Sequence, residues 1–307
     1  MNLLHLRYFY EVARTRSFTE SARSLRVSQP AISKMVRLLE NDLGHALLER
    51  AKSGITLTER GELLFQSASR IFALAEAAEE KMRSSQTELT GEWGVGISDN
   101  LAIHLAPKPL GLFKQRNPKL RVHLFSGTST QIKNELLYDR LRLGIFFTPL
   151  RANERLEFKV VFETEFWIVI SKEGARKFGL KGKPLTLEQL VRARVPRIES
   201  RHRDYAQGFP AHFHSSRLGL TSPPWLEVNQ HEVKKRVVEE GFGYALLTRH
   251  TVEEEIRSGR LLRVDSGQRL RAPVYAAWKK DRGLGSASER FLKLFANCVA
   301  KASVPVS

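Results

Sequence analysis

The sequence contains one cysteine, no long apolar run and no recognisable catalytic motif. With Cys298 alone, the 307-residue chain cannot form an internal disulfide, and it suits a reducing cytosol. No apolar stretch approaches the roughly 18 residues of a membrane helix, and charged residues interrupt the N-terminus before it could act as a secretory signal. The motifs GxSxG, HExxH, CxxC, Walker A and GxGxxG are absent. We therefore expect a cytoplasmic protein that is not an enzyme and holds no cofactor.

Acidic residues are also scarce relative to basic ones. The chain has 33 Asp and Glu against 50 Lys and Arg, a formal net charge of +17, and this excess favours a polyanionic partner such as nucleic acid. Residues 1–60 carry ten basic and six acidic residues, or +4, which leaves +13 for the remainder. Charge alone therefore does not locate the contact.

Three helices are predicted at the N-terminus. Apolar residues recur at helical spacing over residues 3–14. Ser17 and Glu20 form a capping-box pattern that begins a second helix. Ser28 is a suitable N-cap for a third, and Pro30 fits its first turn because the N–H that proline lacks would be unpaired there.

The third helix has an apolar face and a polar face. Its N-terminal polar half carries no acidic residue, which is the pattern of a helix–turn–helix that offers its start to the major groove. Glutamine can pair with adenine, serine is adaptable, and lysine can reach guanine or phosphate. A solvated face of an ordinary bundle is the alternative. The candidate DNA-binding residues of this helix are Ser28, Gln29, Pro30, Ser33, Lys34 and Arg37.

The next 40 residues predict a hairpin and a long helix. Residues 49–61 read as a wing with Arg50 and Lys52 on its arm, able to touch the flanking DNA. From Thr58 to about Glu88, apolar residues step by an average of 3.5, the coiled-coil period of a dimerisation helix. Packing on its own domain is the alternative. The predicted seam residues are Leu64, Ala68, Ile71, Ala75, Ala78 and Met82.

Beyond Gly91 the pattern alternates between strands and helices, which predicts an α/β domain with a mostly parallel sheet. Ligands of such domains bind beyond the C-terminal ends of the strands. Several of these ends carry Ser, Thr or Asn at a helix start, where they could hold a small anion or simply cap the helix. The arginine-rich stretch 192–203 could attract an anion, face DNA or be solvated surface. His212 and His214 lack further ligands nearby, so no metal site is expected.

The stretch "FYEVARTRSFTESARSLRVSQPAISKMVRLLENDLGHALLER", followed by "ITLTERGELL", a seam helix and an α/β domain, resembles the LysR-type transcriptional regulators. The resemblance implies a multi-domain α + α/β protein. Its parts would be a winged helix–turn–helix over residues 1–58, a linker helix over 59–88 and a periplasmic-binding-protein-like (type 2) effector domain over 89–307. That domain would divide into subdomain I, about 89–160 and 268–307, and subdomain II, about 161–267.

The resemblance also implies partners and site residues. The partners would be double-stranded DNA, at an interrupted dyad near a promoter, and a small-molecule effector, for which an anion is one candidate. The chain would also bind copies of itself, as a homodimer or homotetramer, and RNA polymerase. Lys34, Ser53, Arg142 and Thr248 depart from the family pattern. Asp99 departs from it as well, in an effector loop where a hydroxyl residue is frequent, and this leaves the effector's identity open. The effector-binding residues would be Asp99, Asn100, Leu101, Gly127, Thr128, Thr148, Ile198, Ser200, Arg201, His202, Asn229 and Thr248.

The leading hypothesis is thus a sequence-specific DNA-binding regulator switched by a small molecule. Three alternatives remain open: an α/β enzyme with an appended DNA-binding head, a solute-binding protein, and a nucleoid-like non-specific DNA binder. In the leading hypothesis, ligand closes the two halves of the sensor and so changes the way dimers pair on DNA.

Overall fold

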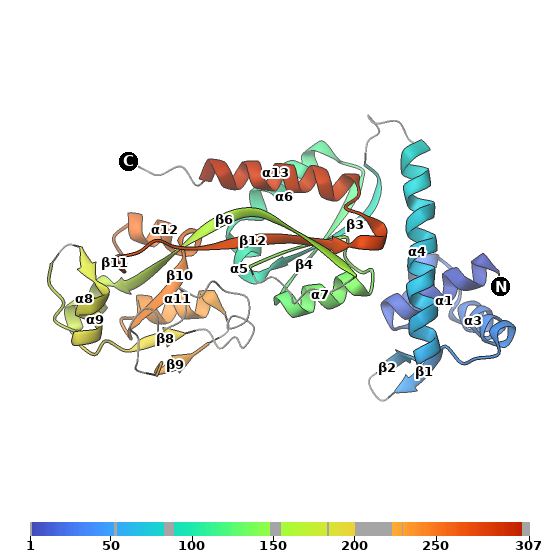
Figure 1. Cartoon of the computed structure of the whole chain (residues 1–307), viewed down its shortest axis with the longest axis horizontal. Helices are drawn as coiled ribbons and strands as arrows, with labels where there is room; N and C mark the ends of the chain where they lie inside the picture. Colours follow the sequence, from blue (N-terminus) through green and yellow to red (C-terminus); the bar gives the residue numbers. More distant parts are fainter. Residues whose placement is uncertain are drawn as a thin grey trace.

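The computed structural model describes residues 2–51, 54–82, 89–147, 155–182, 184–199, 223–228 and 230–302. A small helical unit lies at one end of the molecule, the long helix α4 (Glu59–Met82) stands beside it, and an elongated α/β body extends to the other end (Figure 1). None of the described helices combines the length and apolar character needed to cross a membrane.

The helical unit contains α1 (Leu3–Thr15), α2 (Phe18–Leu25) and α3 (Gln29–Leu43). Each begins at a capping side chain, and the two caps predicted from sequence are confirmed: Ser17 accepts from the backbone N–H of Glu20, and Ser28 from that of Ala31. The inward faces form one core with the start of α4. Its fully buried side chains are Leu6, Phe9, Val12, Ile32, Leu39 and Ala68.

A two-stranded hairpin follows, with β1 (Leu48–Ala51) antiparallel to β2 (Gly54–Leu57) as the pattern predicts. Thr58 joins it to α4 because its hydroxyl donates to the backbone carbonyl of Ala46 and accepts from the N–H of Gly61. This turn brings α4 very close to the chain before the hairpin. A Cβ on Gly61 would lie 2.0 Å from the backbone oxygen of Leu47.

The body is built on ten described strands in one sheet. The order along its main path is β4-β3-β5-β12-β6-β10-β8-β9, and at the side β11 pairs with β6 while β7 pairs with β11. The strands are β3 (Gly91–Ser98), β4 (Leu120–Gly127), β5 (Leu143–Phe146), β6 (Leu156–Ser171), β7 (Leu185–Thr186), β8 (Arg197–Glu199), β9 (Leu226–Glu227), β10 (Tyr244–Thr248), β11 (Leu261–Asp265) and β12 (Leu270–Lys279).

The prediction of a mostly parallel sheet is only half right. Strands β3, β4 and β5 are parallel in one half, and β8, β9 and β10 in the other, but the long strands β6 and β12 between them are antiparallel to each other and to their neighbours. These two strands run the length of the body and connect its halves (Figure 1). The chain therefore forms two α/β subdomains that share a pair of crossing strands.

Helices cover both halves of the sheet. The sequence "LAPKPLGLFKQRNP", residues 105–118, predicts a helix, and α6 lies within it; Pro107 fits its first turn because the N–H that proline lacks would be unpaired there, whereas the short helix α5 before it is not predicted from the sequence. The helices are α5 (Asp99–His104), α6 (Pro107–Arg116), α7 (Ser129–Leu137), α8 (Lys172–Lys177), α9 (Leu187–Arg192), α11 (His231–Glu239), α12 (Arg249–Arg257), the 3-10 turn η2 (Lys280–Arg282) and α13 (Ser286–Ala302), which holds the half-buried Cys298.

The close approach at Gly61 predicts an unusual response to alanine. In an exposed helix, glycine to alanine normally adds roughly 1 kcal/mol of helix stability. Gly61→Ala should instead lower the free energy of unfolding by about 1–3 kcal/mol, because its Cβ would overlap the Leu47 backbone. Urea unfolding of the full chain measures this, with Ser67→Ala on the exposed face of α4 as control. A more stable Gly61→Ala protein would contradict the contact.

Candidate functional site

The predicted reading face of α3 is open to solvent. Gln29, Pro30, Lys34 and Arg37 are exposed and Ser33 is half-buried, whereas Ile32, Val36 and Leu39 are buried beneath them. Ser28 caps the helix, so its hydroxyl is already engaged with a backbone N–H. The remaining backbone N–H groups at this end, with no acidic side chain in the first turn, suit a DNA phosphate. A basic and amide-bearing helix end thus projects from the unit.

The predicted wing residues can be placed only in part. Arg50 lies on β1, but its side chain is outside the described residues, as is Lys52.

The predicted dimerisation seam needs one correction. Ala68 is fully buried in the core of its own helical unit, where it packs with Phe65 and α1, so it cannot face a partner. Leu64 is half-buried there too, and the side chain of Met82 lies outside the described residues. The exposed apolar side chains of α4 include the predicted seam residues Ile71, Ala75 and Ala78, together with two leucines that the sequence does not predict. These leucines are Leu63 and Leu74.

The strand ends predicted to bind a ligand do align. The parallel register places Ser98 of β3 beside Gly127 of β4, with the end of β5 next to them. In the other subdomain, β10 ends at Thr248 beside parallel β8. The first turn of α5 follows β3 directly, and α12 follows β10 directly, so the starts of two helices from different subdomains meet.

Asn100 joins the two subdomains at this point. Its Nδ2 donates to Thr251 Oγ1 at 2.6 Å, while its Oδ1 accepts from Thr248 Oγ1 at 3.1 Å and lies 2.6 Å from His250 Nε2. Since an amide oxygen only accepts, His250 Nε2 must carry a proton. The buried amide of Asn100 in subdomain I therefore depends on side chains of subdomain II for these hydrogen bonds.

His250 is neutral in this arrangement. Burial, helped by the nearby His104, lowers the pKa of His250 to about 3. Its Nδ1 then accepts from Thr164 Oγ1 at 3.4 Å on crossing strand β6, and its ring stacks on Phe147 at 6.3 Å. The neutral ring offers a donor and an acceptor without fixed charge, which suits polar recognition of an uncharged group or a carboxylate.

A second contact between the subdomains carries charge. His104 Nε2 lies 2.6 Å from Glu232 Oε1, and Lys235 Nζ lies 3.1 Å from the other oxygen and 3.2 Å from Glu255. Burial alone would raise the pKa of Glu232, but the hydrogen bonds from His104 and Lys235 outweigh it and lower that pKa. Glu232 therefore remains ionised and holds α5 against α11.

Other predicted effector residues have different roles. Leu101 and Ile198 are corrections, because both are buried in hydrophobic cores and present no side chain at the strand ends. Thr128 caps α7 in a reciprocal capping box with Gln131, the alternative that the sequence left open. Asp99 is exposed and Gly127 is buried. Thr148, Ser200, Arg201, His202 and Asn229 lie outside the described residues, as do His212 and His214.

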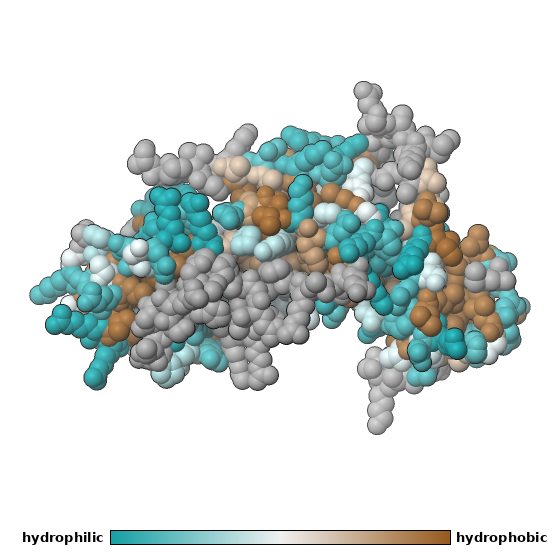
Figure 2. Space-filling view, in the orientation of Figure 1, coloured by the Kyte–Doolittle hydropathy of each residue, from teal (hydrophilic) through white to brown (hydrophobic). Residues whose placement is uncertain are grey.

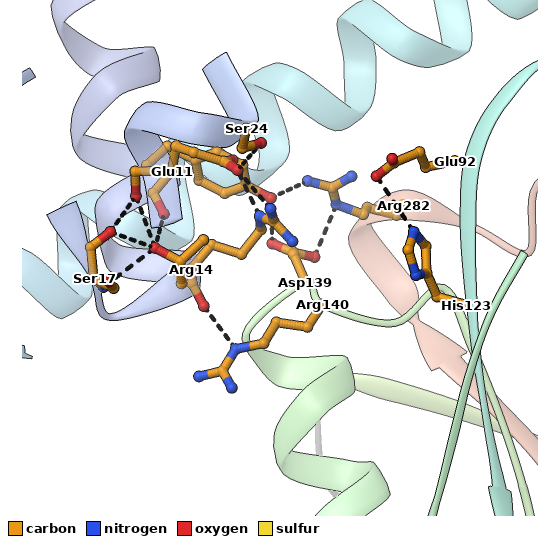
Figure 3. A network of polar contacts seen from close by, with 12 residues as sticks. Glu11, Arg14, Ser17, Ser24, Glu92, His123, Asp139, Arg140 and Arg282 are labelled. Atoms are coloured by element: carbon orange, nitrogen blue, oxygen red, sulfur yellow. Dashed lines mark hydrogen bonds and ion pairs between the residues drawn. The ribbon is translucent and has the colours of Figure 1, made fainter. Parts of the chain in front are cut away.

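The polar cluster beneath the helical unit has no counterpart among the predicted sites. Asp139, whose side chain is 1% exposed, receives hydrogen bonds from Tyr10 and Ser69 at 2.8 Å each, and Lys279 and Arg282 form ion pairs with it at 3.1 and 2.9 Å. These five residues, the Asp139 cluster, come from α1, α4, the turn that follows α7, β12 and η2. Figure 3 shows Asp139 between α1 and Arg282.

Neighbouring contacts reinforce this junction. The Arg140 Nε donates to the backbone carbonyl of Arg14 at 2.7 Å, and Arg16 lies 4.2 Å from the ring centroid of Tyr138 (Figure 3 includes the first pair). Asp139 itself has a positive φ of 57°, a conformation that aspartate tolerates better than most residues. The residues of the Asp139 cluster are up to 272 positions apart in sequence, so no local pattern indicates them.

No group of three His, Cys, Asp or Glu side chains within the described ranges could hold a metal ion.

In comparisons with known proteins, the family model "Bacterial regulatory helix-turn-helix protein, lysR family" matches residues 3–62, and "LysR substrate binding domain" matches residues 86–298. The HTH-type transcriptional regulator BudR of Raoultella terrigena is 30% identical over 80% of this chain and 84% of its own length. BudR of Klebsiella aerogenes is 40% identical over 40% of this chain and 87% of its own. A full-length OxyR variant from Pseudomonas aeruginosa has a similar fold, with a TM-score of 0.76, 20% identity and coverage of 97% and 94% of the two chains.

The exposed face of α3 yields a test of base reading. Replacing Gln29 or Ser33 by Ala should weaken binding to the cognate site by ~1–3 kcal/mol and to random DNA much less, since only base contacts are lost. Fluorescence anisotropy on both DNAs measures the difference. Glu20→Gln, on the exposed face of α2, is the control. Equal losses on both DNAs would defeat the assignment.

Proposed function

Since the chain belongs to the LysR family and is a DNA-binding transcriptional regulator with an effector-binding domain, we propose that effector binding at the subdomain junction alters DNA binding through the Asp139 cluster. The observation that carries the proposal is the position of Lys279. It is the last residue of β12, the strand that crosses both subdomains, and its amine contacts Asp139 beneath the DNA-binding unit.

The proposed effector site is the region around Asn100, Thr248 and His250. Their side chains satisfy one another in the present arrangement, so a ligand that takes over some of these hydrogen bonds would change how the subdomains are held. Asn100 and neutral His250 supply both donors and acceptors. The site therefore suits a small polar molecule, and an anion is one candidate; the effector's identity and the absence of a cofactor stay predictions.

The proposed path to DNA starts at the crossing strands. His250 contacts Thr164 on β6, and β6 pairs with β12 over most of its length. A relative movement of the subdomains bends or shifts these strands, because they are the shared element. Lys279 and Arg282 then move relative to Asp139, Tyr10 and Ser69, and the DNA-binding unit changes its orientation.

We also propose that the chain acts as a homodimer, and pairs further into a tetramer, on an interrupted dyad near a promoter. Exposed apolar side chains support this. Hydrophobic residues gather over α4 and the helical unit in Figure 2. Leu63, Ile71 and Leu74 are exposed on α4, and Leu3 and Leu4 are exposed on α1. Large exposed apolar side chains that gather on one element typically mark a protein interface.

The remaining parts of the proposal concern the setting. A transcriptional regulator works on cytoplasmic DNA, and RNA polymerase is its proposed protein partner at the promoter. The family consists of transcriptional regulators, and we propose that this chain has no enzymatic activity.

The test of the coupling uses the full chain. Its operator is first isolated by footprinting genomic DNA, with random DNA over a salt series as the measure of specificity. A thermal-shift screen then finds a ligand. Tyr10→Phe removes the hydroxyl that donates to Asp139 but keeps the ring that stacks on Phe65. We expect this variant to bind the ligand unchanged, while the ligand's effect on operator affinity falls at least fivefold.

Tyr8→Phe, a half-buried tyrosine of the same helix, is the control and should behave as the wild type. Full coupling in Tyr10→Phe would remove the Asp139 cluster from the path. Equal affinity for operator and random DNA would instead favour the non-specific binder.

The exposed stripe on α4 predicts the dimer interface. Leu74→Asn, at a side chain that is 76% exposed in one protomer, should raise the dimer dissociation constant about tenfold or more because it places an amide in an apolar contact. Mass photometry at nanomolar concentration measures the dimer fraction, and Arg60→Gln near the start of α4 is the control. An unchanged dimer fraction in Leu74→Asn would show that the stripe faces elsewhere.

A further inference from the structure

An arginine-lined hollow lies in subdomain II, far from α3 and bordering the residues around Asn100, since Arg249 of its lining stands between Thr248 and His250 in the chain. It has a volume of about 550 Å³, between α12, the end of β11, the following turn and the crossing strands β6 and β12. In Figure 1 these elements lie at the opposite end of the molecule from α3, and Figure 2 shows hydrophilic side chains over them. The volume is within the roughly 300–1,000 Å³ typical of small-molecule sites.

The charge of the lining is strongly positive. Five arginines face two glutamates, or 5 − 2 = +3. They come from separate elements, so the fold rather than one basic run of sequence brings them together. The arginines are Arg249, Arg257, Arg263, Arg269 and Arg271, and the glutamates are Glu165 and Glu253.

Both glutamates are already used. Glu253 accepts from Arg249 at 2.8 Å, with Arg257 at 3.8 Å, and Glu165 accepts from Arg271 at 2.9 Å. Burial alone would raise the pKa of Glu165, but hydrogen bonds from Arg271 and Trp167 outweigh it and lower that pKa, so this carboxylate is ionised. The two acids thus neutralise part of the lining and no more.

Two guanidinium groups remain without a carboxylate within the described residues. Arg263 lies 4.8 Å from the ring centroid of Trp167, which holds its side chain in place without neutralising it. Arg269, on the turn before β12, makes no ion pair with a described residue.

Arg249 supplies the most specific sign of a missing partner. Its guanidinium lies 5.5 Å from the centroid of the Trp167 ring, and one of its terminal nitrogens pairs with Glu253. Its Nε is buried and has no hydrogen-bond acceptor among the described residues. A buried donor without an acceptor is costly, so the present contacts leave the Arg249 guanidinium only partly satisfied.

From this convergence we propose that the hollow binds a small organic anion with two or more carboxylate or phosphate groups. Guanidinium forks match both groups in a bidentate geometry, and two separate acidic groups are needed to reach Arg263 and Arg269 together with Arg249. Apolar contact comes from Ile256 and Leu270 in the same lining. DNA is a poorer match, because these arginines line a concave hollow far from the reading helix.

Such a ligand would act on the same strand that reaches the DNA-binding unit. Leu270 and Arg271 begin β12, and Lys279 of the Asp139 cluster ends it. The hollow is therefore a second input to the crossing strands, and it lies next to the residues around Asn100.

The test measures binding of two probes, citrate for carboxylates and pyrophosphate for phosphates, to the full chain by isothermal titration calorimetry at fixed ionic strength. Arg263→Gln and Arg269→Gln should each weaken binding of the preferred probe about tenfold. Each substitution removes one charge-assisted hydrogen bond, whose strength is partly screened by water. Arg192→Gln, an exposed arginine of the same subdomain on α9, is the charge-matched control and should bind as the wild type.

Three results would overturn the proposal. The first is that neither probe binds saturably. The second is an equal loss of probe binding in Arg192→Gln, which would reveal a simple effect of net charge. The third is a loss of affinity for random DNA in Arg263→Gln without a loss of probe binding, which would assign the hollow to DNA. Circular dichroism and melting of each variant establish that it is folded. The outcome is independent of the coupling test, because it concerns binding to this hollow alone.

Discussion

The placement of the DNA-binding unit on the rest of the chain depends on one buried carboxylate. Asp139 is almost inaccessible to water, and an ionised group in that position must be compensated by donors and opposite charges. Tyr10 on α1 and Ser69 on α4 donate hydrogen bonds to this carboxylate. Lys279 at the end of β12 and Arg282 on η2 supply two positive charges. All four partners reach Asp139 only while α1, α4, β12 and η2 keep this arrangement. The buried carboxylate therefore fixes the relative position of these four segments.

The crossing strands give that local constraint a long reach. The β6–β12 pairing extends from Leu270 beside Phe166 to Lys279 beside Leu156, with one register shift between Val274 and Tyr275. A paired ribbon of this length moves as one element, since bending it at one end displaces the other. Phe166 and Ile168 of β6 and Val274 and Ala276 of β12 belong to the apolar core of the body. In the proposed coupling, a small change between the subdomains would therefore reach η2 as a displacement of whole side chains.

Much of the N-terminal unit could be predicted from sequence, because its determinants are local. Helix caps at Ser17 and Ser28 and the apolar spacing of α1 and α3 act within a few residues. The seam of α4 shows the limit of such a pattern. Ala68 fits a 3.5-residue repeat as well as its neighbours do, but whether a small apolar residue meets a partner or its own core depends on where α1 and α3 pack.

The functional residues divide in the same way. The face of α3 and the strand ends follow from periodicity and from the topology of parallel strands, and Asn100 and Thr248 indeed meet there. Their partners His250 and Thr251 stand at the start of a helix that the sequence did not predict. The Asp139 cluster joins residues 129 and 210 positions apart, and the sheet's antiparallel centre depends on pairings between equally distant strands. Such contacts arise from packing alone and leave no spacing in the sequence.

The energetics of the Asp139 cluster suit a switch better than a permanent joint. A buried ion pair adds little net stability compared with apolar residues of the same volume, because desolvation offsets most of the attraction. Loss of one partner is nevertheless expensive, roughly 3–5 kcal/mol, since the remaining charge stays buried. Intermediate positions of β12, with Lys279 or Arg282 partly withdrawn, are therefore disfavoured relative to a fully engaged and a fully hydrated state. A shift between two such states requires about 5.5 kcal/mol of differential binding to reverse a 99:1 population, which one or two small ligands can supply.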